Sequence, residues 1–399
     1  MHSIGVPSGR SRLWRFVPAL FAASLGALFL SPLGHSWPFI DLEVYRAVGH
    51  GVLHGVRLYD LRFPGDLAYT YPPFPALLFA ALGAASLQVE EWIATSASVV
   101  LLPTVIWLAL RLRPVDPGLR RSDARALALV AAAIALWTEP VWSTLRYGQI
   151  DLAIAALVLF DLSRPDHARW KGAGIGLAAA VKLTPAIFVV YLLLTRRYRA
   201  FAVAVGSFGA TVAVGYALLP HDSARFFAKV LFGPQRAGRL ENAANQSIRG
   251  ALARLLHTTE VHTLWLCIAA ATALVGLGLA ARAGRRGDEA AGFALCAVSG
   301  LLISPVSWTH HWVLLVPALA VFTLRAYRRR QRVVLAAGAG AVAVACSHMI
   351  WWVPIGQHRH AELHLDAIQL LWADAYVLCA FAALALALAA AVLGPRSAQ

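Results

Sequence analysis

The sequence predicts an all-α protein that crosses a membrane many times. The chain of 399 residues is 59% hydrophobic and 14% charged, whereas about one quarter of a soluble domain is charged. Apolar runs of about 20 residues, the length of a membrane-spanning helix, recur along it. The net charge of +15 does not indicate nucleic-acid binding, because the arginines form short clusters between apolar runs, as in cytoplasmic loops. We expect one domain over residues 1–399, in the cell membrane.

The first apolar run follows Arg10, Arg12 and Arg15 and extends to Leu30. This arrangement resembles a secretory signal, but no small-residue cleavage motif follows it, and many further apolar runs come after it. We therefore expect an uncleaved first helix with its N-terminus in the cytoplasm.

Ten apolar runs predict full spans. They lie near 13–33, 91–112, 124–142, 148–164, 199–219, 261–283, 288–306, 309–325, 332–353 and 366–393. The four cysteines fall within these runs and indicate buried apolar side chains rather than disulfides or metal ligands; they are Cys267, Cys296, Cys346 and Cys379.

Two further stretches are ambiguous. Residues 74–87 form an apolar run of only 14 residues, about 21 Å as a helix, which is short for a bilayer. Residues 172–195 contain Lys182 near the middle, followed by Leu183-Thr184-Pro185, and proline disfavours helix at the residue before it. We favour two short helices that meet at Lys182 on the outer side, which gives about 11 to 13 crossings and keeps the arginines inside.

Polar residues that suit chemistry gather on the expected outer face. The outer segments are 34–73, the corners at Gln149, Lys182 and 304–311, the long loop 220–260 and the loop 354–366. Mainly arginines mark the inner face, and no internal repeat is visible.

The segment after the first helix opens with two carboxylates, Asp41 and Glu43. An ionisable group at the rim of an apolar span faces water, a partner or a substrate. We predict that Asp41 is a general base, with Glu43 as the second choice; alternatively, either residue caps the short helix that follows. Tyr45 lies one turn after Asp41, so it faces the same site or anchors the helix at the interface.

Two further positions favour substrate contacts. Lys182 interrupts an apolar span, which indicates a phosphate contact, unless its ammonium group only reaches the membrane interface. Tyr71 stands directly before Pro72 and Pro73, and this cluster fits a helix start without any other function. Gln149 is a further candidate contact, whereas the sequence does not rank Asp151 against Asp161.

Two outer loops carry the remaining candidates. In the longer loop, Arg249 suits a phosphate, and the Asn245 and Gln246 amides suit sugar hydroxyls; Asn245-Gln246-Ser247 is also a glycosylation sequon. At the corner near 304–311, His310 and His311 suit a phosphate or a sugar, or simply form a polar cap.

The loop histidines His358, His360 and His364 resemble metal ligands, but no second cluster completes a site. We therefore expect no metal and no other cofactor.

These residue types match the needs of glycosyl transfer from a lipid phosphate. A carboxylate takes the proton from the acceptor hydroxyl, and cations or N–H donors hold the departing phosphate. The site must lie at the membrane surface, where the lipid donor is anchored. A strong general acid is unnecessary, because the phosphate already leaves as a stable anion.

The polar blocks resemble those of glycosyltransferase family 87, the polyprenol-phosphate-mannose-dependent α-(1→2)-mannosyltransferases. The likeness covers roughly residues 35–320 in order, and its blocks are FIDLEVYRAV, LYD followed by TYPPFPALLFA, YGQIDLAIAALVLFDL, GIGLAAAVKLTPAIFVVYLLLTRRYRA, NQSIRGALARL and SPVSWTHHWVLLVP. The first 34 residues and those after about 325 contribute only hydropathy.

The resemblance implies a GT-C membrane fold with its active site at the extracytoplasmic face. It implies transfer of mannose from a polyprenyl-phosphate-mannose donor to a glycolipid or lipoglycan, with inversion and without a required metal. Asp41 matches the family's catalytic aspartate, and the other matching positions are Lys182, Asn245, Gln246, Arg249, His310 and His311. One departure is that Asp41 and Glu43 are separated by one residue, which turns them about 200° apart on a helix.

Two alternatives remain open. A secondary transporter or lipid flippase would place ionisable groups near the middle of the membrane, as Lys182 is placed, but polar groups gathered at one face argue against it. The same fold could also use another lipid-linked sugar, such as arabinose or glucose.

Overall fold

The computed structural model describes residues 14–63, 67–83, 85–112, 119–233, 238–356 and 360–393. The described chain is helical apart from one short antiparallel hairpin, β1 (Arg62–Phe63) with β2 (Leu67–Ala68). The prediction of an all-α membrane protein is thereby confirmed. Arg10, Arg12 and His358 lie outside the described residues.

The α-helices follow one another with short connections. In chain order they are α2 (Val17–Leu30), α3 (Ile40–Leu53), α4 (Pro73–Leu82), α5 (Leu87–Leu110), α6 (Arg121–Ala135), α7 (Glu139–Tyr147), α8 (Asp151–Leu162), α9 (Ala173–Val181), α10 (Ile187–Leu194), α11 (Tyr198–Leu218), α12 (Pro220–Arg225), α13 (Ile248–Leu255), α14 (His262–Arg285), α15 (Glu289–Ile303), α16 (Val316–Arg328), α17 (Arg332–Ser347), α18 (Ala367–Ala373) and α19 (Ala375–Leu393).

Several 3₁₀ and π turns connect these helices. The 3₁₀ turns are η1 (Pro32–Gly34), η2 (Leu58–Asp60), η3 (Thr184–Ala186), η6 (Thr309–Leu315), η7 (Met349–Trp351) and η8 (Ala361–His364), and a π-helical turn, η4, covers Phe226–Val230.

Five of the described helices are long and apolar enough to cross a membrane: α5, α11, α14, α17 with its extension, and α19. Large apolar side chains on these helices are exposed, among them Leu274 (78%) and Val333 (83%), as expected for surfaces that face lipid. Shorter apolar helices, including α2 and α15, occupy other predicted spans. The predicted number of crossings therefore stays a prediction.

Three predicted spans are interrupted. The run at 124–142 divides into α6 and α7, which meet at 81°, because the pair Glu139-Pro140 starts a new helix at its first positions. The run at 309–325 begins as η6 before it becomes α16. The run at 366–393 divides at Asp374.

The stretch 172–195 forms two short helices, as predicted. Lys182 ends α9 in an extended conformation (φ −147°, ψ 132°), and η3 and α10 follow. The loop before α9 and the segment after α10 meet, because Arg197 and Asp166 form an ion pair at 3.3 Å. The pair α9–α10 is therefore a helical hairpin with Lys182 near its tip.

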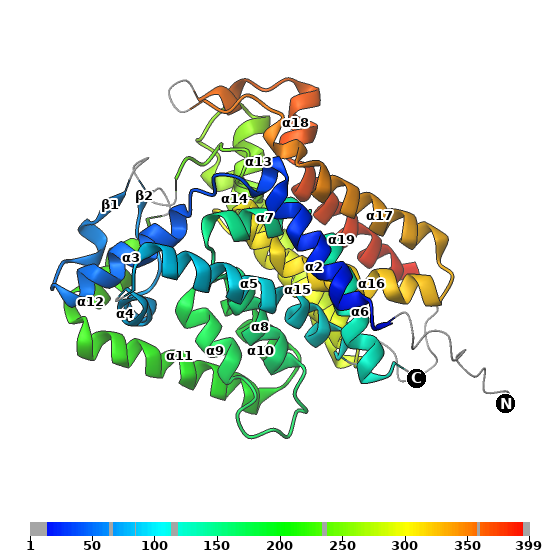
Figure 1. The fold of residues 1–399 in the computed structure, drawn as a ribbon, viewed down its shortest axis with the longest axis horizontal. Coiled ribbons are helices and arrows are strands. Elements are labelled where there is room, and N and C mark those ends of the chain that lie inside the picture. The colour runs from blue at the N-terminus through cyan, green and yellow to red at the C-terminus, as the bar shows by residue number, and fades with distance from the viewer. Residues whose placement is uncertain are drawn as a thin grey trace.

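The stretch 74–87 contains only the ten-residue helix α4, which packs against α3. The contact is close: a Cβ on Gly49 of α3 would lie 2.4 Å from the carbonyl of Phe79 on α4. In Figure 1 this pair and the β1–β2 hairpin lie at the left, away from the start of α2 and the end of α19 at the lower right.

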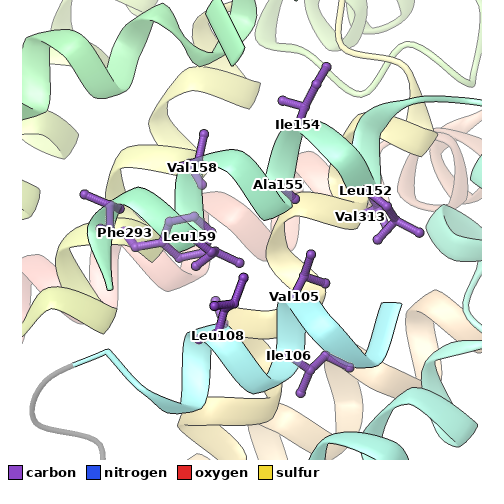
Figure 2. Close-up of a cluster of buried hydrophobic side chains, with 14 of the residues drawn as sticks. Val105, Ile106, Leu108, Leu152, Ile154, Ala155, Val158, Leu159, Phe293 and Val313 are labelled. Atoms are coloured by element: carbon purple, nitrogen blue, oxygen red, sulfur yellow. The ribbon is translucent and has the colours of Figure 1, made fainter. Parts of the chain in front are cut away.

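The largest hydrophobic core joins α5, α8, α15 and η6. Figure 2 shows Val105 and Leu108 of α5 facing Ala155 and Leu159 of α8, with Phe293 of α15 beside them. Val313 of η6 belongs to the same core. This packing fixes the start of α8 against η6, and both segments carry polar residues at the same end of the bundle.

Candidate active site

The start of α3 holds Asp41 against the end of α7. Phe39, the residue before α3, has a left-handed backbone (φ +44°), and its N–H donates to the Arg146 carbonyl at 3.0 Å. Asp41 follows in the first helical turn, where the helix dipole stabilises a carboxylate. Asp41 is half-buried, whereas Glu43 is exposed. This difference supports Asp41 over Glu43 as the base.

A chain of hydrogen bonds surrounds the Asp41 carboxylate. Gln149 bonds to it, and because a carboxylate only accepts, the Gln149 amide must donate. The Gln149 Oε1 then accepts from the Tyr45 hydroxyl at 2.9 Å. The Tyr45 oxygen lies 3.0 Å from the Tyr71 hydroxyl; since the Tyr45 proton goes to Gln149, Tyr71 is the donor. These four predicted residues thus form one network.

Burial raises the pKa of Asp41 from 3.8 to about 6, although the Gln149 bond and the Lys182 charge both lower it. Asp41 is therefore ionised at neutral pH yet more basic than an exposed aspartate, which suits a general base. Burial also raises the pKa of Tyr45 and of Tyr71, so both hydroxyls keep their protons.

Lys182 lies in the same cluster. Its Nζ donates to Asp151 Oδ1 at 2.7 Å and lies 5.5 Å from the centre of the Tyr71 ring. Both members of the Lys182–Asp151 pair are buried. Asp151 offsets the cost of burying the ammonium group, and the three Nζ protons leave Lys182 able to donate to a second oxyanion.

His310 and His311 of η6 complete the cluster. His310 Nε2 lies 3.9 Å from Asp151 Oδ2, and the two imidazole rings are 4.7 Å apart. Asp151 Oδ2, His310 Nε2 and His311 Nδ1 are buried and make no hydrogen bond within the described chain. Buried polar atoms are normally bonded, so these three atoms indicate where a substrate group or water binds.

The same three residues offer ligand atoms within 4.8 Å of one another. One carboxylate and two imidazoles are a donor set that zinc accepts. Lys182 already brings a positive charge to the other Asp151 oxygen, however, and this charge favours an anion beside the histidines. The expectation that no metal is needed stays a prediction.

Asn245 and Gln246 are fully buried and hold two loops together. The Asn245 side chain accepts from the Ser307 N–H at 2.9 Å and donates to the Leu240 carbonyl at 2.9 Å. Gln246 donates to the Ala243 carbonyl at 2.7 Å and accepts from the Tyr376 N–H at 3.2 Å. These amides use their polar atoms within the protein. We therefore assign them to positioning the loop before η6, rather than to sugar contacts or glycosylation.

Arg249 is set apart from the cluster. Its guanidinium lies over the Trp265 ring at 5.2 Å, and the charge that acts on it is that of Glu260. His360 of the outer loop donates to Glu241 at 2.7 Å. Neither residue joins the groups around Asp41 in the described structure.

Asp151 is the site residue that sequence reasoning did not rank. Asp161, the alternative, accepts from the Gly172 N–H at 2.8 Å and from the Ile175 N–H at 3.0 Å, so it caps α9. Lys182 could have pointed to Asp151, because a positive charge within an apolar run requires a negative charge in a neighbouring run.

The arrangement combines a base with an anion site. Asp41 can accept a proton, and the Lys182 ammonium group and the histidine N–H groups can hold a phosphate beside it. These groups come from α3, η6 and the tip of the α9–α10 hairpin. Buried side chains of α3 form a separate cluster, against which Ile150 and Leu183 pack.

A sequence model described as glycosyltransferase family 87 matches residues 69–305. The matched segment includes Tyr71, Gln149 and Lys182. Asp41 lies before the matched segment, and His310 and His311 follow it.

Curated relatives cover most of the chain. One is "Polyprenol-phosphate-mannose-dependent alpha-(1-2)-phosphatidylinositol mannoside mannosyltransferase" of Mycobacterium tuberculosis, 32% identical over 89% of this chain and 86% of its own. The protein of the same name from Mycolicibacterium smegmatis is 34% identical over 92% and 88%. A pentamannoside mannosyltransferase of M. smegmatis is 35% identical over 77% and 76%.

Among solved structures, that of ArnT from Cupriavidus metallidurans bound to undecaprenyl phosphate has a TM-score of 0.45 at 15% identity, over 97% of this chain and 80% of that chain. A likeness of this size does not establish a shared ligand.

Proposed function

Because the chain belongs to glycosyltransferase family 87, and is therefore a membrane glycosyltransferase, we propose that it transfers mannose from a polyprenyl-phosphate-mannose donor to a glycolipid or lipoglycan hydroxyl. The names of its relatives support this donor and an α-(1→2) linkage. The family assignment also removes the transporter alternative. We place the active site at the extracytoplasmic face, because the arginine clusters after α10, α14 and α16 lie together, joined by the Arg285–Leu194 and Arg325–Asp288 contacts, as in a cytoplasmic end.

The observation that carries the proposal is the position of Asp41 beside the cationic Lys182 cluster. The acceptor hydroxyl gives its proton to Asp41 while its oxygen forms a bond to the anomeric carbon. The bond from that carbon to the phosphate oxygen breaks, and its electrons leave with the polyprenyl phosphate. A single displacement of this kind inverts the anomeric configuration.

Lys182 and an imidazole N–H from His310 or His311 hold the phosphate as its charge develops. Interactions of this kind act more strongly away from bulk water. Asp151 keeps the Lys182 ammonium group directed into the site. Gln149 orients the Asp41 carboxylate; Tyr45 donates to Gln149, and Tyr71 in turn donates to Tyr45.

The test is mannose transfer in membranes from a radiolabelled polyprenyl-phosphate-mannose donor, with expression checked for each variant. We expect Asp41→Asn to lose about 10²- to 10⁴-fold in rate, and Glu43→Gln, the matched control, to remain near wild type. Lys182→Met is expected to weaken use of the donor. Near-normal transfer by Asp41→Asn would refute the assigned base, and no transfer by the wild type would refute the donor.

A further inference from the structure

A second cationic position lies beside the site, on the last turn of α7. The Arg146 guanidinium is centred 4.2 Å from the Trp142 ring and 4.9 Å from the Tyr147 ring. Its Nε is buried without a hydrogen-bond partner, and no carboxylate of the described chain lies within ion-pair distance of it. We call Arg146, Trp142 and Tyr147 the arginine cage.

Several other arginines that are partly buried in the described structure have acidic partners, although Arg249, over the Trp265 ring, has none within ion-pair distance among the described residues. The pairs are Arg46–Glu90, Arg197–Glu289, Arg239–Glu362, Arg254–Asp374 and Arg325–Asp288. In the arginine cage, by contrast, aromatic rings are the neighbours. Stacking uses the flat faces of a guanidinium and leaves its N–H edges available for two parallel bonds to an oxyanion.

The arginine cage adjoins the proposed base. The Arg146 carbonyl accepts from Phe39, two residues before Asp41. The Tyr147 ring packs 6.0 Å from that of His310, whose Nε2 lies 3.9 Å from Asp151 Oδ2. Arg146 and Lys182 thus lie on two different elements that border the site, α7 and the α9–α10 hairpin.

The surroundings of the arginine cage are those of a membrane interface. The indole N–H groups of Trp142 and Trp37 both donate to the Leu33 carbonyl, at 2.7 and 2.8 Å, and Trp37 packs against Phe29 at 5.1 Å. Clustered tryptophan side chains typically lie at the level of lipid head groups. Lipid phosphodiesters are anions that lie at this level.

We propose that Arg146 binds the phosphodiester of an anionic glycolipid acceptor and thereby positions the acceptor hydroxyl at Asp41. This inference rests on the proposed function, in which the single phosphate of the donor occupies the Lys182 cluster. Arg146 is then free to bind the other substrate, the acceptor. The same chemistry is offered by a bilayer phospholipid, so the test must separate the two sources.

The experiment compares two acceptors that carry the same oligosaccharide, one on a phosphodiester lipid and one on a neutral alkyl chain. Transfer is measured in bilayers of zwitterionic lipid with the same donor. The variants are Arg146→Gln, Arg146→Lys and, as a matched control, Arg57→Gln, because Arg57 is exposed. Thermal unfolding of each variant checks its folding.

We expect Arg146→Gln to lower kcat/KM for the anionic acceptor about tenfold or more, mainly through KM, and to leave the neutral acceptor unchanged. Arg146→Lys restores part of the loss, because it keeps the charge but not the paired geometry. Arg57→Gln behaves as the wild type.

Other results would overturn the inference. Equal losses for both acceptors would assign Arg146 to the donor phosphodiester when thermal unfolding is unchanged, and to the structure when it is not; either result refutes the acceptor contact. Anionic phospholipid can also be added to the bilayer. If Arg146→Gln then lowers transfer to the neutral acceptor as well, Arg146 binds a bilayer phospholipid and not the acceptor. Wild-type transfer to both acceptors with unchanged Arg146→Gln rates would refute the inference and leave the proposed function standing, whereas no wild-type transfer to either would refute the proposed function itself.

Discussion

Asp41 occupies a position that favours its protonated form in the folded protein. Burial raises its pKa from 3.8 to about 6, so its contribution to stability is fully present below about pH 4 and is lost as the pH rises through about 6. The difference corresponds to about 3 kcal/mol at neutral pH. The ionised Asp41 is therefore a stronger base than an exposed aspartate, but it lowers the free energy of unfolding at neutral pH.

This linkage predicts that Asp41→Asn is more stable than the wild type at neutral pH, since the amide removes the buried charge. Thermal unfolding in detergent at pH 7.5 should show a higher Tm for the variant, and near pH 4.5 the difference should shrink. Glu43→Gln, at an exposed position, should show no such pattern. A lower Tm for Asp41→Asn at both pH values would contradict the assignment.

The raised pKa of Asp41 also predicts how the rate of transfer depends on pH. Because the base must be ionised, kcat/KM should rise with pH through about 6 and then become level. Rates with both substrates well below saturation report the free enzyme. The residual activity of Asp41→Asn should lack this rise; a wild-type profile that falls above pH 6 would indicate a different base.

The sequence predicts some site residues better than others. It singles out Asp41 and Lys182, because a charge beside or within an apolar run is costly unless it meets a partner or a substrate. Asp151 was not ranked, since its value depends on a partner 31 positions away that only the packing of α8 against the hairpin tip supplies. Asn245 and Gln246 are polar loop residues, and whether an amide faces a carbonyl or a sugar depends on tertiary contacts.

At the scale of elements, the position of Lys182 depends on a contact between α9 and α11. A Cβ on Gly176 of α9 would lie 2.2 Å from the Ala204 carbonyl, and one on Gly172 would lie 2.0 Å from the Ala200 carbonyl. Small residues four apart on each helix let the backbones approach closely, a common feature of membrane helices.

We therefore predict that Gly176→Val separates α9 from α11 and displaces the hairpin tip. Overpacking typically lowers stability by about 1–3 kcal/mol, and transfer should fall as Lys182 moves. Gly209→Val is the matched control, because a Cβ on Gly209 of α11 meets nothing within 4 Å. Transfer rates and Tm of the two variants provide the measurement, and equal effects of both would argue against the contact.

The location of most apolar elements was predictable from hydropathy, but their internal breaks were not all seen. Pro185 predicts the turn at Lys182. Hydropathy predicts one continuous span at 124–142, whereas the structure bends by 81° before α7, at the helix-start signal Glu139-Pro140. Glu139 is buried there and accepts from Trp351 and Tyr376, both at 3.2 Å. Such contacts between distant segments decide whether a local signal interrupts a helix.

At the scale of the whole molecule, the two ends of the bundle differ in chemistry. One end carries the Asp41 cluster and the arginine cage. The other carries exposed arginines at the ends of α10, α14 and α16, among them Arg196, Arg286 and Arg329.

This asymmetry predicts the orientation in the membrane. In a variant without native cysteines, Arg57→Cys should react with an impermeant maleimide on intact cells, whereas Arg329→Cys should react only after permeabilisation. Both positions are exposed in the protein, so the two cysteines differ only in the side of the membrane on which they lie. Labelling in the reverse order would place the active site in the cytoplasm.

The brevity of the α9–α10 hairpin has a further consequence. The nine residues of α9 reach only about 13 Å above the arginine end, less than half the thickness of a hydrocarbon core of about 30 Å. Because the tip of this hairpin lies in a site at the head-group level, we expect the bilayer beside α9 and α10 to be locally thin. The rate of transfer should therefore depend on bilayer thickness, and it should fall in vesicles made of lipids with longer acyl chains.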